Sequence, residues 1–215
     1  MENIKVVEIS NLTKDIKGTK VLNNVSLSLE SGKAYGIVGR NGSGKSMLFK
    51  AICGLINATE GEIKVFDKPI KNGNFPDSTG IIIENPGFLP QYSAFKNLKI
   101  LASINNTISD EKINETIALV GLDPNNKKPV RKYSLGMKQR LGIAQALMEE
   151  PKLLVLDEPM NGLDSEGVKQ IRELLLELKS KSVTILLASH NSEDINEICD
   201  YVYNMENGVL SKEYN

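Results

Sequence analysis

The pattern of hydrophobic and polar positions predicts strands that alternate with helices along most of the chain. Three short runs, Ala34–Val38, Leu153–Leu156 and Val183–Leu187, are almost entirely apolar, as in strands that are buried on both faces of a parallel sheet. Between the last two runs, apolar residues recur at the helical period from Val168 to Leu178. We therefore expect an α/β fold around a mainly parallel sheet.

The N-terminal part of the chain has a different pattern. Val25–Leu29 alternates apolar and polar residues as a half-buried antiparallel strand does, and Val6–Ile9 and Gly61–Phe66 are further short strands. A helix is expected from about Lys45 to Ile56. Near the other end of the chain, Asn207-Gly208 between two short apolar runs predicts a hairpin. These patterns indicate an antiparallel β subdomain at the N-terminus.

Residues from about 88 to 140 predict helices that are separated by polar loops. They follow the short apolar strand Ile81–Ile83 and precede the strand Leu153–Leu156. We interpret this segment as a helical subdomain that is inserted between two strands, within a single domain over residues 1–215.

Composition places the chain among ordinary globular proteins, with 40% hydrophobic and 25% charged residues and a net charge of −1. Such a balance argues against a nucleic-acid partner. Because the sequence holds neither a spanning apolar run nor a secretory signal, we expect a cytoplasmic chain, for which any membrane association would come through a partner. Cys53 and Cys199 are expected to be buried thiols rather than a disulfide or metal ligands.

A glycine-rich segment lies between the strand Ala34–Val38 and the helix that is predicted from Lys45. It matches the phosphate-binding pattern G-x-x-x-x-G-K-[ST] at every fixed position. Its residues are Gly39, Arg40, Asn41, Gly42, Ser43, Gly44, Lys45 and Ser46. The N–H groups of such a loop and of the helix N-terminus bind phosphate oxygens, and Met47 completes the expected contact set. The alternative is a glycine-rich turn that ends by chance in Lys-Ser.

The expected ligand of this loop is ATP with Mg²⁺. Lys45 supplies a positive charge for the β- and γ-phosphates and so has a catalytic role, while the hydroxyl of Ser46 is a ligand for Mg²⁺. A guanine site requires an N/T-K-x-D element, and neither Asn126–Pro129 nor Thr13–Asp15 supplies it. Adenine is therefore the preferred base.

Two carboxylates, Asp157 and Glu158, follow the buried strand Leu153–Leu156. Ligands of open parallel sheets bind at this carboxyl end of the strands. We expect Asp157 to hold Mg²⁺ and Glu158 to activate the attacking water. The alternative is a solvated strand end with two charges. His190 follows the next predicted strand at the same kind of position, from which it can reach the γ-phosphate; a lone histidine is otherwise commonly a structural residue.

Together these motifs resemble the ABC ATPase family, over nearly the whole chain. Tyr133–Arg140 is similar to the family signature, Asn161–Asp164 looks like its D-loop, and His190 falls on its switch histidine. The resemblance implies that Ser134 and Gly136 contact the γ-phosphate of ATP in a second subunit. It also implies a head-to-tail pair, of identical or related chains, and a transmembrane permease as partner.

The sequence departs from the family pattern at three places. Leu135 and Met137 replace signature residues, and Ile16 stands where an aromatic residue commonly stacks on adenine, which predicts weak base selectivity. Glu84 replaces the glutamine after the strand Ile81–Ile83. This replacement, with Asn85–Phe88, looks like the branch of bacitracin-resistance and lantibiotic-immunity exporters. We expect the carboxylate of Glu84 to coordinate Mg²⁺ or a water molecule bound to it. In this way Glu84 would sense the nucleotide and couple its state to the permease.

Phe88, Tyr92 and Phe95 form an aromatic cluster directly after Glu84. They belong either to a docking groove for a partner helix or to the core of the helical subdomain. The predicted function is ATP hydrolysis for an exporter of antimicrobial peptide or another hydrophobic compound. Two alternatives stay open at this point: a soluble ABC ATPase that acts on the ribosome or nucleic acid, and a nucleotide-binding regulator that does not hydrolyse ATP.

Overall fold

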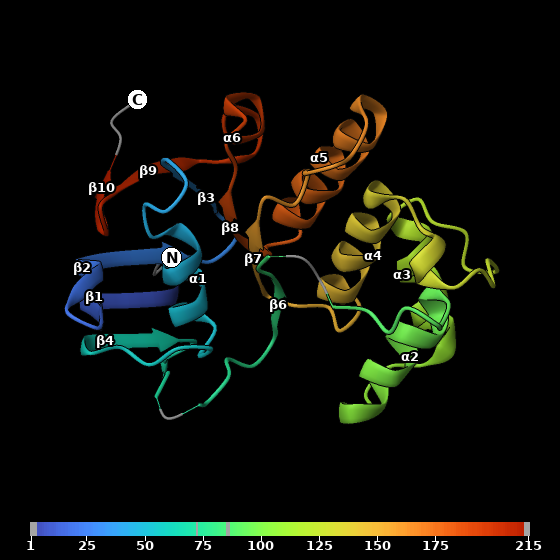
Figure 1. Cartoon of the computed structure of the whole chain (residues 1–215), viewed down its shortest axis with the longest axis horizontal. Helices are drawn as coiled ribbons and strands as arrows, with labels where there is room; N and C mark the ends of the chain where they lie inside the picture. Colours follow the sequence, from blue (N-terminus) through green and yellow to red (C-terminus); the bar gives the residue numbers. More distant parts are fainter. Residues whose placement is uncertain (1–3, 72, 85–86, 213–215) are drawn as a thin grey trace.

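The computed structural model describes residues 4–71, 73–84 and 87–212. Within these ranges, strands and helices alternate along most of the chain (Figure 1). The strands are β1 (Lys5–Ile16), β2 (Thr19–Glu30), β3 (Ala34–Val38), β4 (Glu60–Val65), β5 (Lys68–Pro69), β6 (Thr79–Ile82), β7 (Leu153–Asp157), β8 (Thr184–Ala188), β9 (Tyr201–Glu206) and β10 (Val209–Lys212). The helices are α1 (Lys45–Ile52), α2 (Ala94–Asn105), α3 (Asp110–Leu119), the 3₁₀ helix η1 (Val130–Lys132), α4 (Leu135–Leu147), α5 (Ser165–Ser180) and α6 (Ser192–Ile198).

A six-stranded sheet with the order β10-β9-β3-β8-β7-β6 forms the centre of the molecule. All neighbours in it pair in parallel except β10 and β9, which are antiparallel across Asn207-Gly208. The α/β fold and the terminal hairpin are thus confirmed. Leu153 and Val155 of β7 belong to one hydrophobic core, and Leu154 and Leu156 belong to the other. Because both faces of the strand are buried, its sequence is continuously apolar.

A second sheet, with the order β2-β1-β4-β5, is antiparallel and covers one side of α1. Its strands β1 and β2 are 12 residues long, well beyond the predicted Val6–Ile9 and Val25–Leu29. Most of the added residues are polar, although Leu12, Thr13 and Leu22 among them are buried. The pairing of β1 with β2 shifts register between Ile9 and Leu12 and again between Leu12 and Lys14, and such irregularities interrupt strict alternation. Hydrophobic periodicity therefore found only the regular part of each strand.

Helix α1 lies between the two sheets and ends at Ile52, four residues before the predicted end. The N–H of Gly54 donates to the carbonyl of Ala51 (3.1 Å), and the N–H of Leu55 donates to that of Lys50 (2.9 Å). This pair of hydrogen bonds closes a helix C-terminus and satisfies its last carbonyls. The apolar residues up to Ile56 continue the hydrophobic pattern without continuing the helix.

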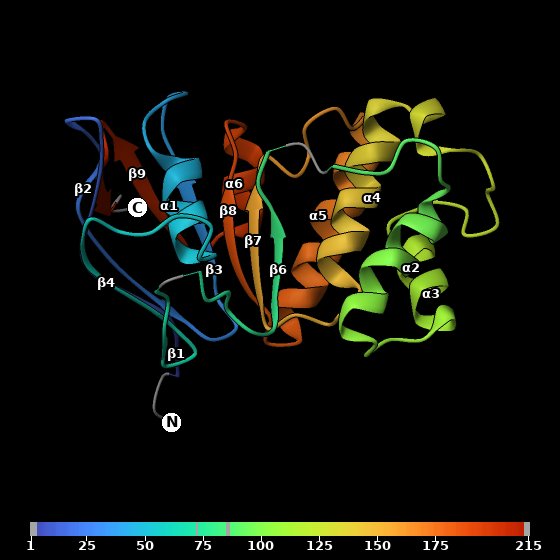
Figure 2. The same ribbon diagram turned by 60° about the horizontal axis from the view of Figure 1, so that its bottom comes forward.

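Helices α2, α3 and α4 fill the segment between β6 and β7 and lie together on one side of the central sheet (Figure 2). Phe88 and Phe95 are half-buried and pack against the hydrophobic core that these helices share with the sheet, whereas Tyr92 is exposed. For the two phenylalanines the structure therefore supports a place in the core. Asn85 and Pro86 lie outside the described residues.

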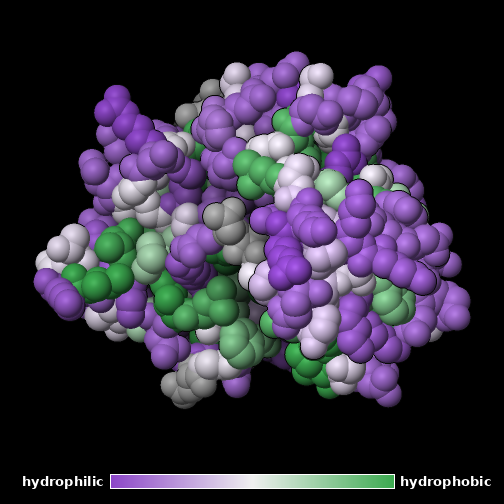
Figure 3. All heavy atoms as spheres, turned by 45° about the vertical axis from the view of Figure 1, so that its right-hand side comes forward, coloured by the Kyte–Doolittle hydropathy of each residue, from purple (hydrophilic) through white to green (hydrophobic). Residues whose placement is uncertain are grey.

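Hydrophilic residues cover most of the face in Figure 3, and hydrophobic residues gather there in smaller, separate patches. Among the residues that the structure describes, no helix is both long and apolar enough to cross a membrane. Cys53 is a buried free thiol and Cys199 a half-buried one. The predicted burial is confirmed for Cys53, whereas Cys199 is only partly buried.

Candidate active site

A cavity of about 530 Å³ opens at the carboxyl end of the central parallel strands. The segment between β3 and α1 forms one wall of it, and Asp157 and Glu158 at the end of β7 form another. Glu84, directly after β6, also reaches the cavity. Residues that are far apart in the sequence thus meet at the sheet edge where ligands of such folds bind. From the glycine-rich segment, the lining residues are Asn41, Gly42, Gly44, Lys45, Ser46 and Met47.

The other residues of the glycine-rich segment face a second cavity. Gly39, Arg40 and Ser43 line a space of about 510 Å³ between this segment and the β9–β10 hairpin. The loop therefore separates two cavities, and only one of them contains the acidic pair. The sequence alone predicted that all eight residues of the loop contact the nucleotide in one site.

Close backbone contacts explain why the loop is rich in glycine. Gly39 has φ 145°, and a Cβ on it would lie 2.2 Å from the carbonyl oxygen of Met205. Gly44 has φ 117°, and a Cβ there would lie 2.9 Å from the carbonyl oxygen of Val21. Any larger residue would collide with the backbone at Gly39 and would be strained at both positions. The loop is thereby held between β2 and β9, with Lys45 at its end.

Lys45 is buried and runs back along the loop. Its ammonium group donates to the carbonyl oxygens of Gly39 (2.7 Å) and Arg40 (3.2 Å). Inside the loop, the hydroxyl of Ser43 is buried and has no hydrogen-bond partner among the described residues. Helix α1 begins beside these groups without an acidic residue in its first turn. The loop therefore presents one ammonium group and the N–H groups of a helix N-terminus to the same region.

Ser46 and Asp157 are brought together from α1 and β7. The Ser46 hydroxyl donates to Oδ2 of Asp157 over 2.5 Å. Both residues line the larger cavity. A hydroxyl and a carboxylate at this separation form a pair of oxygen ligands of the kind that Mg²⁺ prefers.

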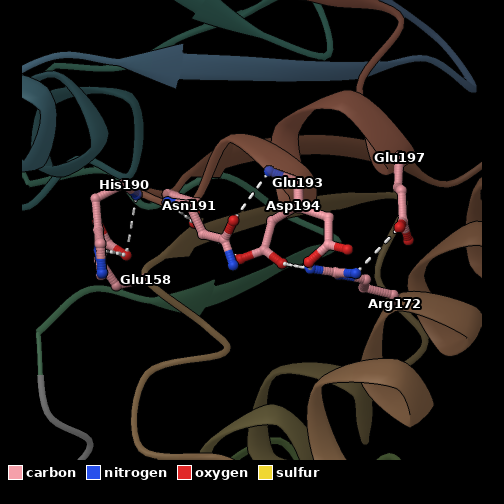
Figure 4. A network of polar contacts seen from close by, with 8 residues as sticks. Glu158, Arg172, His190, Asn191, Glu193, Asp194 and Glu197 are labelled. Carbon is pink, nitrogen blue, oxygen red and sulfur yellow. Dashed lines mark hydrogen bonds and ion pairs between the residues drawn. The ribbon is translucent and has the colours of Figure 1, made fainter. Parts of the chain in front are cut away.

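Glu158 and His190 are also in contact, as Figure 4 shows. Oε2 of Glu158 lies 2.7 Å from Nδ1 of His190 and accepts a longer hydrogen bond from the His190 N–H (3.4 Å). The Glu158 N–H donates to the carbonyl of Ala188 in β8 (2.9 Å). This backbone contact and the left-handed conformation of Glu158, with φ 51°, direct its side chain toward the end of β8. The structure therefore pairs the two residues for which the sequence predicted catalytic roles.

Glu84 makes an ion pair that the sequence did not predict. Its Oε1 lies 2.5 Å from Nζ of Lys50, on α1. The carboxylate of Glu84 is mostly exposed and its residue lines the cavity, while the stem of Lys50 is largely covered by the protein. The negative charge of Glu84 at the cavity wall is thus paired with the positive charge of Lys50.

Ser134 and Gly136 lie at the start of α4 and line neither of the two cavities. Ser134 is the N-cap: its hydroxyl accepts from the N–H of Met137 (3.2 Å). A Cβ on Gly136 would lie 3.0 Å from the carbonyl oxygen of Gly162. The signature segment therefore packs beside the loop that follows Glu158, but it is not part of its own chain's cavity.

Three further residues line the cavity: Val21, Gln139 and Asn161. The sequence placed Gln139 in the signature-like segment and Asn161 in the D-loop-like segment without predicting that they line the site, and it did not single out Val21. Gln139 is buried in α4, and its amide donates to the carbonyls of Glu158 (3.2 Å) and Pro159 (2.9 Å). A polar residue on the buried face of the helix, two positions before Leu141, was the available signal for it. Val21 belongs to β2, and no pattern in the sequence brings that strand to the loop. Ile16, by contrast, does not line the cavity.

A family model described as ABC transporter matches residues 22–161 of this chain. The chain belongs to the ABC transporter family. It is the ATP-binding component of such a transporter and an ATPase. The match includes the glycine-rich loop, the start of α4 and the acidic pair at the end of β7, so the motifs of the sequence analysis are those of the family.

Several ABC transporter ATP-binding proteins are similar to this chain over most of their own length. The chain is 49% identical over 206 residues to the uncharacterized ABC transporter ATP-binding protein YybJ of Bacillus subtilis (strain 168), covering 95% of this chain and 94% of YybJ. Identity to the bacitracin transport ATP-binding protein BcrA of Enterococcus faecalis is 40% over 213 residues, covering 98% and 69%. The lantibiotic transport ATP-binding protein SrtF of Streptococcus pyogenes is 38% identical over 211 residues, covering 97% and 91%. The resemblance to this branch of the ABC transporters is confirmed.

Solved structures agree with this assignment. A nucleotide-free ATP-binding cassette from an ABC transporter has a TM-score of 0.84 at 27% identity, covering 99% of this chain and 92% of the other. The ATP-binding subunit of another ABC transporter has a TM-score of 0.87 at 26% identity, covering 97% and 89%. A dimeric cassette in a post-hydrolysis state, bound to ADP and Pi, shares the fold with a TM-score of 0.85 at 23% identity, covering 97% and 99%.

Proposed function

We propose that this chain hydrolyses ATP to drive the export of an antimicrobial peptide or another hydrophobic compound. The observation that carries the proposal is the contact between Glu158 and His190 beside the phosphate loop. Glu158 and Lys45 line the same cavity, and His190, which is not among its lining residues, contacts Glu158. The names of BcrA and SrtF, which refer to bacitracin and lantibiotic transport, support the substrate class.

The loop fits a nucleoside triphosphate. The buried Ser43 hydroxyl lacks a hydrogen-bond partner among the described residues, and Gly42 has open space beside its Cα. Lys45 adds a positive charge at the start of α1. Polyphosphates bind where backbone N–H groups, a helix N-terminus and an ammonium group converge. In this proposal all residues from Gly39 to Met47 contribute to nucleotide binding, directly in the larger cavity or by shaping the loop.

The residues also fit Mg²⁺. Ser46 and Asp157 supply two oxygen ligands in contact with each other, and Glu84 supplies a third oxygen donor on the cavity wall. Bound Mg²⁺ neutralises part of the phosphate charge and orients the γ-phosphate. Because Lys50 already neutralises Glu84, we assign Ser46 and Asp157 as the principal ligands and Glu84 as a group that acts through water.

Hydrolysis requires a water molecule in line with the γ-phosphate and a group that accepts its proton. The carboxylate of Glu158 is that base, and its hydrogen bond to His190 fixes its orientation. His190, whose side chain extends into solvent, contacts the γ-phosphate, while Lys45 stabilises charge on the transferring group. Catalysis is then mostly positioning and electrostatic stabilisation, as in other phosphoryl transfers.

The active unit in this proposal is a head-to-tail pair of ATPase subunits, with identical or related chains. Ser134 is exposed at a helix N-terminus and lines neither cavity of its own chain, so it is available to a facing subunit together with Gly136. The fold is shared with a cassette that was solved as a dimer. A transmembrane permease holds the pair at the inner face of the cell membrane, and the exposed Tyr92 is part of the permease contact.

Replacing Glu158 by glutamine tests the catalytic assignment. Because the amide keeps the shape of the side chain but cannot accept the proton, turnover should fall at least about a hundredfold while ATP still binds. In size-exclusion chromatography with ATP and Mg²⁺, Glu158→Gln should elute as a dimer that EDTA dissociates. Glu173→Gln, on the exposed face of α5, is the matched control and should behave as the unmodified chain. Fast hydrolysis by Glu158→Gln would refute the assignment.

Export is tested separately in cells that carry the chain together with its permease. Cells with the unmodified chain should survive higher concentrations of bacitracin or of a lantibiotic than cells with Glu158→Gln. Equal sensitivity of the two strains would contradict the export of these compounds and would leave the ATPase assignment intact.

A further inference from the structure

A buried polar cluster connects α5 to the loop that carries His190, and the proposed reaction does not use it (Figure 4). Its centre is Asp194, which is 1% exposed. Oδ1 of Asp194 accepts from Nε of Arg172 (2.8 Å), and Oδ2 accepts from the hydroxyl of Ser189 (2.9 Å). Ser189 is the residue directly before His190, so α5 is linked to the site through three side chains.

Arg172 is also buried and forms ion pairs with three carboxylates. Besides Asp194, it contacts Glu193 (2.8 Å) and Glu197 (3.1 Å), which both lie on the outer side of α6. The hydrogen bond to Glu193 raises the pKa of Arg172 above its ordinary value, and Asp194 adds to this shift. Arginine is charged in proteins, and the guanidinium of Arg172 holds Oδ1 of Asp194 while Ser189 holds Oδ2.

Removing such charges from water has a cost that a well-packed apolar cluster would avoid. Stability alone therefore does not explain why a charged cluster, rather than an apolar one, joins α5 and α6. The cluster instead orients its members: Oδ1 of Asp194 faces two guanidinium nitrogens of Arg172, Nε at 2.8 Å and Nη2 at 2.7 Å, and Oδ2 accepts from the Ser189 hydroxyl. The group whose direction is set in this way is the hydroxyl of Ser189.

The Ser189 hydroxyl uses its proton and its lone pair on different partners. Because it donates to Asp194, its oxygen is free to accept from the N–H of Asn191 (3.1 Å). This bond spans His190 and closes a tight turn with His190 at its centre. Asn191 then caps α6 by accepting from the N–H of Glu193 (2.9 Å). These hydrogen bonds fix the conformation of the backbone before and after His190.

The side chain of His190 has little other support. It is 74% exposed, and among the residues that the structure describes its only side-chain partner is Glu158. Its orientation must therefore come from the backbone turn and from that single contact. The backbone turn depends on the Ser189 hydroxyl, which accepts from the N–H of Asn191. Asp194, itself held by Arg172, orients this hydroxyl.

We propose that Ser189, Asp194 and Arg172 are positioning residues that hold His190 in the direction its contact with the γ-phosphate requires. This inference rests on the proposed function of His190 in hydrolysis. It predicts that loss of the cluster impairs turnover rather than nucleotide binding, because the phosphate loop lies on other elements.

The kinetic test replaces Ser189 by alanine in the full chain. This small change removes both hydrogen bonds of the hydroxyl without adding volume. We expect kcat of ATP hydrolysis to fall roughly tenfold, because a displaced group loses most of its effect, with KM for ATP changed less than about twofold. The matched control is Ser109→Ala, which removes the N-cap hydroxyl of α3 far from the site and should leave kcat unchanged.

A spectroscopic test does not depend on activity. His190 is the only histidine of the chain, so an untagged sample gives one set of imidazole C–H resonances in NMR. Ser189→Ala and Asp194→Asn should move these resonances toward the position of a free histidine, whereas Ser109→Ala should not. Unchanged imidazole resonances, or an unchanged kcat in Ser189→Ala, would overturn the inference.

His190→Ala separates failure of this inference from failure of the proposed function. If His190→Ala keeps full hydrolysis, the catalytic role of His190 is wrong, whatever the cluster does. If His190→Ala loses hydrolysis while Ser189→Ala leaves both kcat and the imidazole resonances unchanged, only the positioning role is wrong.

Discussion

At the scale of single residues, Glu84 shows how a charge is accommodated beside a phosphate site. A carboxylate at the cavity wall repels the phosphates of ATP, and a glutamine at this position would not. The ion pair with Lys50, at 2.5 Å, offsets that repulsion. The sequence identified Glu84 because it follows a buried strand, but Lys50 precedes it by 34 residues and carries no pattern that marks it as a partner.

Replacing Lys50 by methionine keeps the volume of the stem and removes the charge. We expect KM for ATP to rise roughly threefold, which corresponds to about 0.7 kcal/mol for a partly exposed ion pair, and the effect to shrink in 0.5 M salt. The measurement is steady-state ATPase kinetics at low and high ionic strength. In the double variant Lys50→Met/Glu84→Gln, KM should return to that of the unmodified chain. An equal rise in the single and double variants would show that the charge of Glu84 is not the cause.

At the scale of elements, β6 of the central sheet packs closely against α4 of the inserted helices. Gly80 of β6 faces the backbone of α4, where a Cβ would lie 2.1 Å from the carbonyl oxygen of Ala146. This approach places α4, with Gln139 and Ser134, next to the end of β7. Hydrophobic periodicity predicted both elements but not their distance, because a glycine within a strand only indicates that something approaches closely.

Gly80→Ala should therefore push β6 and α4 apart. We expect a loss of about 1–3 kcal/mol in the free energy of unfolding, the usual cost of overpacking, measured by urea denaturation. Gly87→Ala is the matched control, since a Cβ there would meet no atom within 4 Å of the described structure, and its change should stay within about 0.5 kcal/mol. Equal stability of the two variants would contradict the close packing of β6 and α4.

At the scale of the whole molecule, two hydrophobic cores lie on opposite faces of one sheet. Cys53 belongs to the core between the two sheets, and Cys199 packs against the core under the helices. Burial raises the pKa of both thiols to about 12. Because β7 and β8 contribute alternate side chains to both cores, neither core can lose its order without disturbing the other.

The two thiols report whether the cores unfold together. At pH 8 a thiol with a raised pKa is almost entirely protonated and unreactive, whereas in an unfolded chain its pKa returns to about 8.5. We expect a thiol reagent such as DTNB to detect neither cysteine in the native chain and both at the same urea concentration. Reaction of one thiol at a clearly lower concentration would show that the two cores unfold separately.

The sequence by itself determined the fold class, the phosphate loop, the acidic pair and the resemblance of this chain to the ABC ATPases. These features are local: a strand buried on both faces, a turn that requires glycine and a helix period are each written in consecutive residues. Even so, the rest of β1 and β2 escaped detection, since register shifts and mostly polar residues there interrupt the alternating pattern.

Only the tertiary structure decided which distant groups meet. The contacts of Lys50 with Glu84, of Gln139 with the end of β7 and of Asp194 with Arg172 and Ser189 each join separate elements. The energies of such contacts depend on distances of a few ångströms between side chains, which the strand order and packing of the sheet determine. Residue types restrict what these groups can do, but their positions follow from the fold as a whole.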